Sequence, residues 1–152
     1  MAETILVSAC LLGLETRYDG SHNLNSSIIE YLRTEELTAI PICPEQLAGL
    51  ATPRPKTRFT AGDGEAVLDG VGRMEDELGT DMALVFLRGA QMSLQIARLN
   101  QCNRAILKQR SPSCGCRTIY LQTEKTEGMG VTAALLSRNG IKLLSEEDFP
   151  SE

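Results

Sequence analysis

The stretch Ile5-Leu6-Val7-Ser8-Ala9-Cys10 decides the fold, because a short apolar run typical of a buried strand is followed at once by a cysteine. The same arrangement returns at Pro41-Ile42-Cys43, and again at Ala105-Ile106-Leu107, whose following loop reaches Cys114. Short apolar runs that alternate with amphipathic segments are typical of parallel α/β sheets. The loops after the strands meet at one edge of such a sheet, so we expect these cysteines to lie together there.

The segments between these strands have helical spacing. Ser27 and Glu30 have the spacing of a capping box that opens a short helix through Arg33, and Pro44 suits the first turn of another helix. The longest helix is expected over residues 81–100, because its apolar residues form one stripe and its arginines and glutamines lie opposite. The remaining predicted elements are a strand over 37–42, a strand or edge over 119–121, a helix over 131–138 ended by Asn139-Gly140, and a last strand over 141–144.

Residues 52–79 interrupt this alternation. Pro53-Arg54-Pro55 cannot continue a regular helix or a central strand. Turn signals at Gly62-Asp63-Gly64 and Asp69-Gly70 surround Ala66-Val67-Leu68, so we expect a small β-ribbon. Residues 1–152 are therefore predicted to form one α/β domain: an open, mostly parallel sheet of the Rossmann or flavodoxin-like kind, with helices on both faces and a β-ribbon excursion.

The composition excludes several classes of function. The 15 basic and 20 acidic residues give a net charge of −5, which argues against general nucleic-acid binding. No apolar stretch is long enough to cross a bilayer and the first residues lack the features of a signal peptide, so we expect a cytoplasmic protein without a membrane partner. The single histidine, His22, excludes sites built on several histidines, and its polar surroundings favour a solvated loop position. In a reducing cytoplasm the five cysteines need an explanation other than structural disulfides.

Three converging thiols have several physical interpretations. Cys10, Cys43 and Cys114 can form a buried apolar cluster, bind zinc, or hold an iron–sulfur cluster. The paired C-x₂₋₄-C knuckles of structural zinc sites are absent, whereas an iron–sulfur cluster tolerates scattered ligands and, with three of them, leaves one iron open. Cys102 precedes its strand and belongs at the opposite edge as a small apolar residue. Cys116 is separated from Cys114 by one glycine, so one of that pair should face away.

Polar residues next to the cysteines are candidates for catalysis. Glu45 follows Cys43 by two residues and can serve as general acid or base, or simply as a carboxylate in the first turn of a helix. Ser111 and Ser113 flank Pro112 in a rigid turn that can aim hydroxyl and N–H groups at a ligand, or that is an ordinary serine-proline loop.

Taken together, these stretches resemble the bacterial DUF523 family, whose characterised members are thiouracil desulfidases. The resemblance runs in collinear order through nearly the whole chain. Its blocks are Ile5–Gly13, Arg17-Tyr18-Asp19-Gly20, Pro41–Leu50, Thr52-Pro53-Arg54-Pro55, Ile106–Gly115 and Gly130–Leu136.

The resemblance implies an oxygen-sensitive [4Fe-4S] cluster held by Cys10, Cys43 and Cys114, with one open iron that takes the sulfur of a thiolated pyrimidine. It implies that Glu45 activates water for attack at the ring carbon and that Ser111 assists proton movement or holds the substrate. The products would be uracil and sulfide, without net redox change. Residues expected to contact the substrate are Ser113, Arg17, Asp19 and Arg54.

Two departures from the family pattern concern the substrate. Lys56-Thr57-Arg58 stands where the family usually has Pro-x-Glu, and Leu121-Gln122 replaces an Asp-Gly turn. A second function also stays open, namely an iron–sulfur or thiol-based binding or redox protein without hydrolytic activity. That alternative would hold if Cys116 joined the three cysteines and capped the open iron.

Basic residues cluster in two short segments of this acidic chain. Arg104 begins a strand and belongs at the far edge of the sheet. The others, together with Arg17, are expected to form a positive rim around the site, unless Lys56 and Arg58 merely solvate the ribbon. A rim of this kind predicts a thiolated nucleoside or nucleotide as substrate besides the free base. The residues concerned are Arg54, Lys56, Arg58, Lys108, Arg110 and Arg117.

Overall fold

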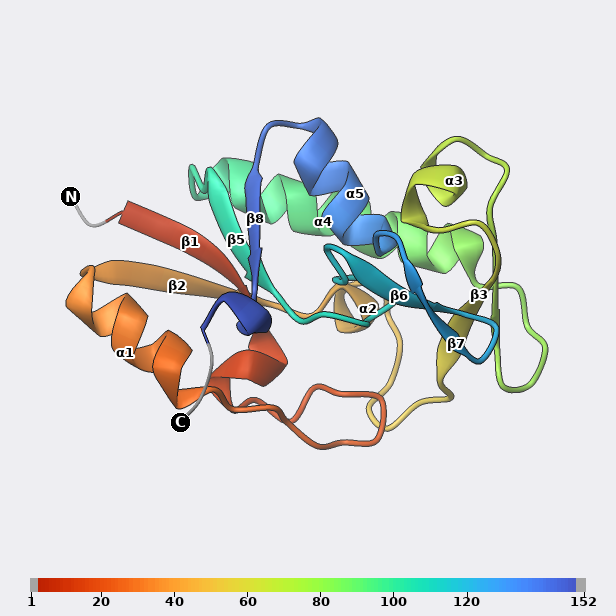
Figure 1. Ribbon diagram of the computed structural model, residues 1–152, viewed down its shortest axis with the longest axis horizontal. Coiled ribbons are helices and arrows are strands. Elements are labelled where there is room, and N and C mark those ends of the chain that lie inside the picture. The colour runs from red at the N-terminus through yellow and green to blue at the C-terminus, as the bar shows by residue number, and fades with distance from the viewer. Residues whose placement is uncertain (1–2, 150–152) are drawn as a thin grey trace.

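β1 (Glu3–Ser8) lies inside a four-stranded parallel sheet in the computed structural model, which describes residues 3–149. It pairs with β2 (Leu37–Ile42) on one side and with β5 (Arg104–Leu107) on the other, and β8 (Lys142–Ser145) extends the order to β2-β1-β5-β8. Because every pair is parallel, the C-terminal ends of β1, β2 and β5 converge near the middle of the molecule (Figure 1). The predicted open parallel sheet is confirmed.

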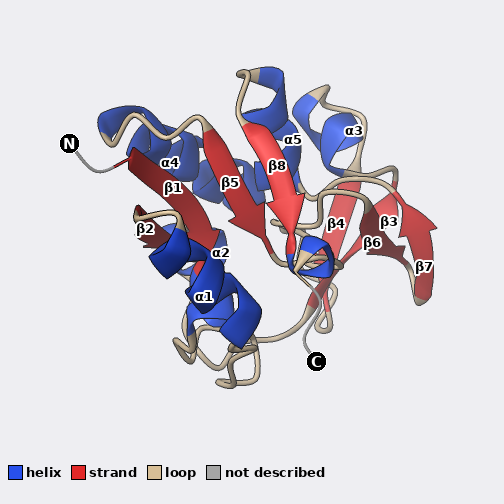
Figure 2. Ribbon diagram, turned by 60° about the vertical axis from the view of Figure 1, so that its left-hand side comes forward, coloured by secondary structure: helices blue, strands red, loops and turns tan. Residues whose placement is uncertain are grey.

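The strands are apolar on both sides because both faces of this sheet are covered. Ile5, Val7 and Ile106 pack in one cluster with α1 (Ser26–Thr34). Leu6 and Leu107 point the other way, into a cluster that includes α4 (Ala83–Leu99) and α5 (Val131–Arg138). Figure 2 shows α1 on one side of the sheet and α4 on the other, so the prediction of helices on both faces is confirmed.

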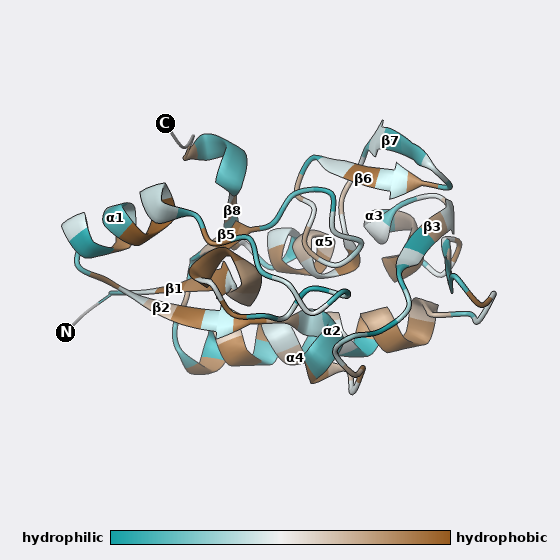
Figure 3. Cartoon of the chain, turned by 90° about the horizontal axis from the view of Figure 1, so that it is seen from below, coloured by the Kyte–Doolittle hydropathy of each residue, from teal (hydrophilic) through white to brown (hydrophobic). Residues whose placement is uncertain are grey.

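A second, mixed sheet has the order β4-β3-β6-β7. Its strands are β3 (Thr57–Ala61), β4 (Arg73–Asp76), β6 (Thr118–Leu121) and β7 (Glu124–Glu127). The antiparallel pair β3–β4 is the predicted ribbon. β7 is an edge strand built from charged and polar residues, which protects the sheet edge from pairing with another chain (Figure 3).

Residues 66–68, which we expected inside the ribbon, instead belong to a short helix, α3 (Gly64–Leu68). The Asp63 side chain accepts a hydrogen bond from the backbone N of Ala66 at 3.2 Å and so caps this helix. The apolar run was too short to distinguish helix from strand by period alone. The start of α1 also differs from prediction: its N-cap is Asn25, whose side chain accepts from Ile28 N at 3.1 Å, rather than Ser27.

Helix α4 connects the two sheets. Phe86 and Ala90, in its N-terminal half, pack in a cluster with Phe59 of β3. Leu94 and Ala97, in its C-terminal half, pack beneath the parallel sheet. The predicted apolar stripe is confirmed, and Figure 3 shows apolar and polar residues alternating along the helix. No helix in the described part of the chain is both long and apolar enough to span a membrane.

Candidate active site

A cleft of about 620 Å³ opens at the edge where β1, β2 and β5 end. This volume lies in the range of small-molecule sites, which is about 300–1,000 Å³. Cys10, Cys43 and Cys114 all line the cleft, one from each loop, whereas Cys102 and Cys116 do not. The predicted convergence of these three cysteines is therefore observed.

Local structure fixes each of the three cysteines. Cys10 lies in a single 3₁₀ turn, η1 (Ala9–Leu12), directly after β1. Cys43 is the N-cap of α2 (Pro44–Leu47), where Pro44 occupies the first helical position as predicted. The loop that carries Cys114 is attached to the start of α5, because Val131 N donates to Pro112 O at 2.9 Å and Ala133 N donates to Ser113 O at 3.0 Å.

The thiols share one electrostatic environment. All five cysteines are free. Burial is the main cause that raises the pKa of Cys10, Cys43 and Cys114. The charges of neighbouring thiols add to that effect at Cys10 and Cys114, and the charge of Glu45 adds to it at Cys43 and Cys114. Within residues 3–149, no group of three or more His, Cys, Asp or Glu side chains is arranged around a single metal ion. The three thiols line one cleft, and within this part of the chain they do not form a site for a single ion.

Hydrogen-bond donors lie beside each of these sulfur atoms and favour the thiolate form. The Ser8 hydroxyl lowers the pKa of Cys114, and the Asn23 side chain lowers that of Cys10, although burial outweighs both effects. Arg54 Nη2 lies 3.9 Å from Cys43 Sγ. Ser8 Oγ already accepts from Lys108 N at 3.0 Å, which leaves its proton available for the sulfur.

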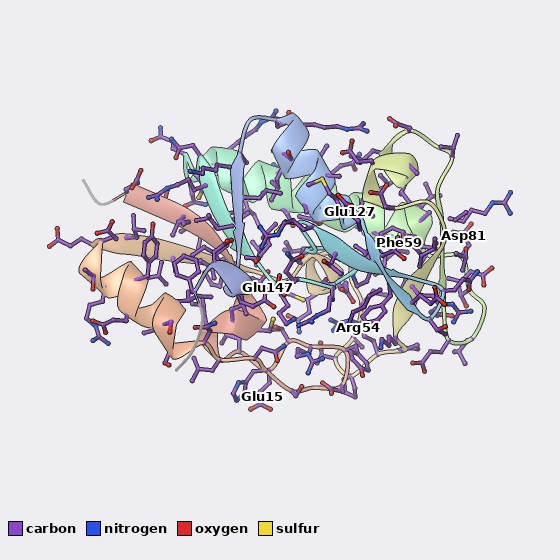
Figure 4. The ribbon with its side chains drawn as sticks, in the orientation of Figure 1. Glu15, Arg54, Phe59, Asp81, Glu127 and Glu147 are labelled. Carbon is purple, nitrogen blue, oxygen red and sulfur yellow. The ribbon has the colours of Figure 1, made fainter. Side chains whose placement is uncertain are left out.

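Glu45 is held by two partners that the sequence did not associate with it. Arg54 Nε donates to Oε1 at 2.9 Å, and Ser113 Oγ donates to Oε2 at 3.3 Å. The ion pair is buried, with 5% of the Arg54 side chain and 14% of the Glu45 side chain exposed. Figure 4 shows Arg54 near the centre of the view, between the loop after β1 and the second sheet. The Glu45 carboxylate therefore has one fixed orientation at the cleft wall.

Arg54 was expected to contact the substrate, but all its N–H groups have protein acceptors. Besides Glu45, Nη1 donates to Ala51 O and Thr52 Oγ1, and Nη2 donates to Thr16 O at 2.9 Å and to Cys43 Sγ. A guanidinium has five N–H donors, and this network uses each of them. Its geometry favours a positioning role for Arg54 over direct contact with a substrate phosphate.

Of the other predicted site residues, some line the cleft and some do not. Ser111 lines the cleft, and its Oγ accepts from Ser113 N at 3.2 Å and from Cys114 N at 3.1 Å. Ser113 is buried and reaches the cleft through Glu45. Arg17 lines the cleft, while Asp19 does not; Asp19 accepts from the Ser21 hydroxyl at 2.6 Å, and Ser21 accepts from Arg17 Nη1.

Gln109 is a buried residue that sequence reasoning missed. Its Oε1 accepts from the backbone N of Cys116, Arg117 and Thr118, at 3.1–3.2 Å. Its Nε2 donates to Oε1 of Glu147, which belongs to the C-terminal 3₁₀ turn η2 (Glu146–Asp148) and is labelled in Figure 4. Gln109 thus fixes the return of the loop that carries Cys114. No local signal marks it, because a lone glutamine after a strand is usually exposed.

Cys116 and Cys102 lie away from the cleft. The Cys116 thiol faces Ser145 and lies near Arg117 and Asp148, and it does not line the cleft. Cys102 is buried at the other end of the sheet, where its Sγ lies 3.6 Å from Thr4 Oγ1. Only one member of the Cys114/Cys116 pair therefore faces the cleft.

The positive rim is smaller than the sequence indicated. Arg104 pairs with Glu3 at the far edge, as expected. Arg117 lies outside the cleft and contacts Glu147 and Asp148, and Lys108 Nζ lies 2.8 Å from Glu146 Oε2 in an ion pair. Lys108 and Arg54 also line the cleft but are paired with Glu146 and Glu45. The other cations that line it are Arg17, Lys56, Arg58 and Arg110, which we call the cationic rim.

Two members of this rim, Lys56 and Arg110, are only weakly engaged by the protein. Lys56 Nζ lies between two aromatic rings, 5.6 Å from the Tyr18 centroid and 5.4 Å from the Tyr120 centroid. Within residues 3–149, neither Lys56 nor Arg110 has a carboxylate within ion-pair distance. The cleft mouth is therefore aromatic and positive, although Glu77 also lines it.

Comparisons with known proteins agree with this description. The family model for 2-thiouracil desulfurase matches residues 5–148. The uncharacterized protein YbbK of Bacillus subtilis is 40% identical over 148 residues, covering 95% of this chain and 97% of YbbK. The solved structure of the [4Fe-4S]-dependent thiouracil desulfidase TudS matches with a TM-score of 0.82 and 38% identity, covering 97% of this chain and 93% of TudS. The resemblance stated from the sequence is confirmed.

Proposed function

This chain belongs to the 2-thiouracil desulfurase family, and from that premise we propose that it hydrolyses the C–S bond of a thiolated pyrimidine. In the overall reaction one water enters, the ring C=S becomes C=O, and hydrogen sulfide leaves without a change of redox state. The observation that supports the proposal best is the meeting of three cysteine thiols with a fixed carboxylate, Glu45, in one cleft.

We propose Cys10, Cys43 and Cys114 as the ligands of a [4Fe-4S] cluster. The chain fits such a group because the thiols come from three separate loops, line one cleft of about 620 Å³, and each have a donor beside the sulfur. When bound through three cysteines, the cluster supplies one iron without a protein ligand, a soft centre suited to sulfur.

Glu45 is proposed as the general base that takes a proton from water. Arg54 donates to Oε1 and Ser113 donates to Oε2. The carboxylate oxygens retain further lone pairs, which can accept the proton from water. Ser111 contributes differently. Both acceptor sites of its hydroxyl are used by Ser113 N and Cys114 N, so its O–H proton is the part available to a substrate.

The non-hydrolytic alternative depends on a fourth cysteine ligand. Cys116 is the nearest candidate in the sequence, and its thiol faces Ser145 rather than the cleft. This placement favours three ligands and an enzyme over an electron carrier or binding protein.

The cationic rim supports a thiolated nucleoside or nucleotide as substrate, besides the free base. Lys56 and Arg110 offer positive charge without a carboxylate partner in the described part of the chain, and arginine binds phosphate bidentately. Comparing 4-thiouracil, 4-thiouridine and 4-thiouridine monophosphate at low and high salt tests this. A phosphate preference that weakens with salt and is lost in Lys56→Ala supports it; equal or free-base-only activity contradicts it.

The decisive experiment is sulfide release from 2-thiouracil and 4-thiouracil by anaerobically reconstituted protein. Glu45→Gln should keep iron and substrate binding and lose turnover by about 10²–10⁴-fold, the usual contribution of a positioned proton-transfer group. Glu30→Gln, which changes an exposed carboxylate far from the cleft, is the matched control. Loss of the cluster in Glu45→Gln, or full activity, would reject Glu45 as the base.

A further inference from the structure

Asn23 carries a buried polar group that the proposed reaction does not use. It lines the cleft, and its backbone N donates to Cys10 O at 2.8 Å, which fixes it beside that cysteine. Its side-chain Nδ2 is shielded from solvent and makes no hydrogen bond within the described residues. Buried N–H groups are nearly always paired, so this one indicates an acceptor that the polypeptide itself does not supply.

The neighbour of this amide identifies the acceptor. The Asn23 side chain lies beside Cys10, to which its backbone is also bonded, yet Nδ2 makes no hydrogen bond within the described residues. A neutral thiol is a weak acceptor, whereas an anionic sulfur accepts a much stronger, charge-assisted hydrogen bond. The cleft places comparable donors at the other two cysteines, Ser8 beside Cys114 and Arg54 Nη2 beside Cys43.

We propose that Asn23 is a positioning residue that tunes the reduction potential of the bound cluster. Its Nδ2–H donates to the Cys10 sulfur when that sulfur is an anionic ligand of the cluster. This inference rests on the proposed cluster. Hydrogen bonds to the sulfurs are among the features that set the reduction potential of an iron–sulfur cluster. A donor withdraws electron density from sulfur and favours the more reduced, more negative state. Asn23 therefore raises the potential of the cluster and slows its oxidation by dioxygen.

The test uses the whole chain, reconstituted anaerobically, with three readouts: iron and sulfide content, the reduction midpoint from a spectroscopic titration, and the decay of the visible absorbance in air. Asn23→Leu removes the donor at similar volume. We expect unchanged iron content, a more negative midpoint and air decay faster by about fivefold, the factor that one ordinary hydrogen bond is worth. Asn23→Ser, which keeps a hydroxyl donor, should recover part of both effects.

Asn25→Ala is the matched control, because it removes a side chain from the same loop that caps α1 and lies outside the cleft. It should lower thermal stability and leave the midpoint and air decay unchanged. A wild-type midpoint in Asn23→Leu overturns the inference, and so does a shift of equal size in Asn25→Ala. If Asn23→Leu does not fold, Asn23→Ala takes its place under the same criteria. Failure of the wild type to bind a cluster rejects the proposed function itself, whereas normal loading with an unshifted Asn23 variant rejects only this inference.

Discussion

Replacing Arg54 should destabilise the protein more than any surface cation would. Its guanidinium donates to Glu45 in an ion pair that is almost fully buried, and to the carbonyl groups of Thr16 and Ala51 and the hydroxyl of Thr52. Arg54→Ala removes every one of these donors and leaves the Glu45 carboxylate inside the protein with only Ser113 as a partner.

The magnitude follows from these contacts. A hydrogen bond to a charged group contributes about 1.5–3 kcal/mol and one to a neutral acceptor about 1 kcal/mol. Breaking a buried pair by removing one partner costs about 3–5 kcal/mol, because the remaining charge is uncompensated. We therefore expect Arg54→Ala to lower the free energy of unfolding by about 3–5 kcal/mol. Arg54→Lys keeps the charge but loses the planar fork, so about 1–3 kcal/mol is expected.

Urea unfolding of the cluster-free protein under reducing, anaerobic conditions measures these values. Arg33→Ala is the control, since its ion pair with Glu30 is exposed and should contribute less than about 0.5 kcal/mol. In the double variant Arg54→Ala/Glu45→Ala the cost should fall below the sum of the two single variants, because the stranded charge is gone. A loss below about 1 kcal/mol for Arg54→Ala, or strict additivity in the double variant, would refute this reasoning.

Three other predictions concern the thiols and their supporting loop. Cys116→Ala should bind as much iron as the wild type while Cys114→Ala loses the cluster, and equal loss in both would mean that Cys116 is a ligand. Gln109→Ala should lower the free energy of unfolding by about 2–4 kcal/mol, because buried backbone N–H groups lose their acceptor, whereas the exposed Gln91→Ala should change it little. The raised pKa of the buried thiols means that they stay protonated in the folded, cluster-free protein while unfolded thiols ionise above about pH 8.5. The contribution of these thiols to the free energy of unfolding should therefore be constant below that pH and fall above it. A free energy of unfolding that stays the same from pH 7 to 10 in urea titrations would contradict the assigned burial.

The sequence predicted those parts of the site whose positions are determined by the topology of the parallel sheet. Cys10, Cys43 and Cys114 each follow a short apolar strand, and a parallel sheet brings such positions to one edge whatever the loops do in detail. The helix over 131–138 was predicted with its true ends, because Gly140 stands where the chain needs a positive φ, here 81°.

The parts that sequence missed depend on contacts between distant segments. Asn23, Gln109 and the Arg54–Glu45 pair have no local pattern, because their partners lie in other loops or in other elements. Gly89 is a further example: glycine inside a helix is unfavourable, yet a Cβ there would collide with the carbonyl oxygen of Pro44. Only the close approach of α2 to α4 explains this glycine, and that approach is what holds Cys43 at the cleft.

The two walls of the cleft have separate origins, and this division has a functional consequence. The sulfur wall comes from loops of the parallel sheet, whereas Lys56, Arg58 and Tyr120 lie in or next to strands of the second sheet. Helix α4 packs under both sheets, so one rigid element fixes the distance between the walls. Lys56 and Arg58, the members of the cationic rim in or next to the second sheet, can therefore change in sequence without moving the thiols. The departures from the family pattern at residues 56–58 and 121–122 fall on the wall formed by the second sheet, where they would alter which thiolated compound binds and leave the proposed cluster ligands in place.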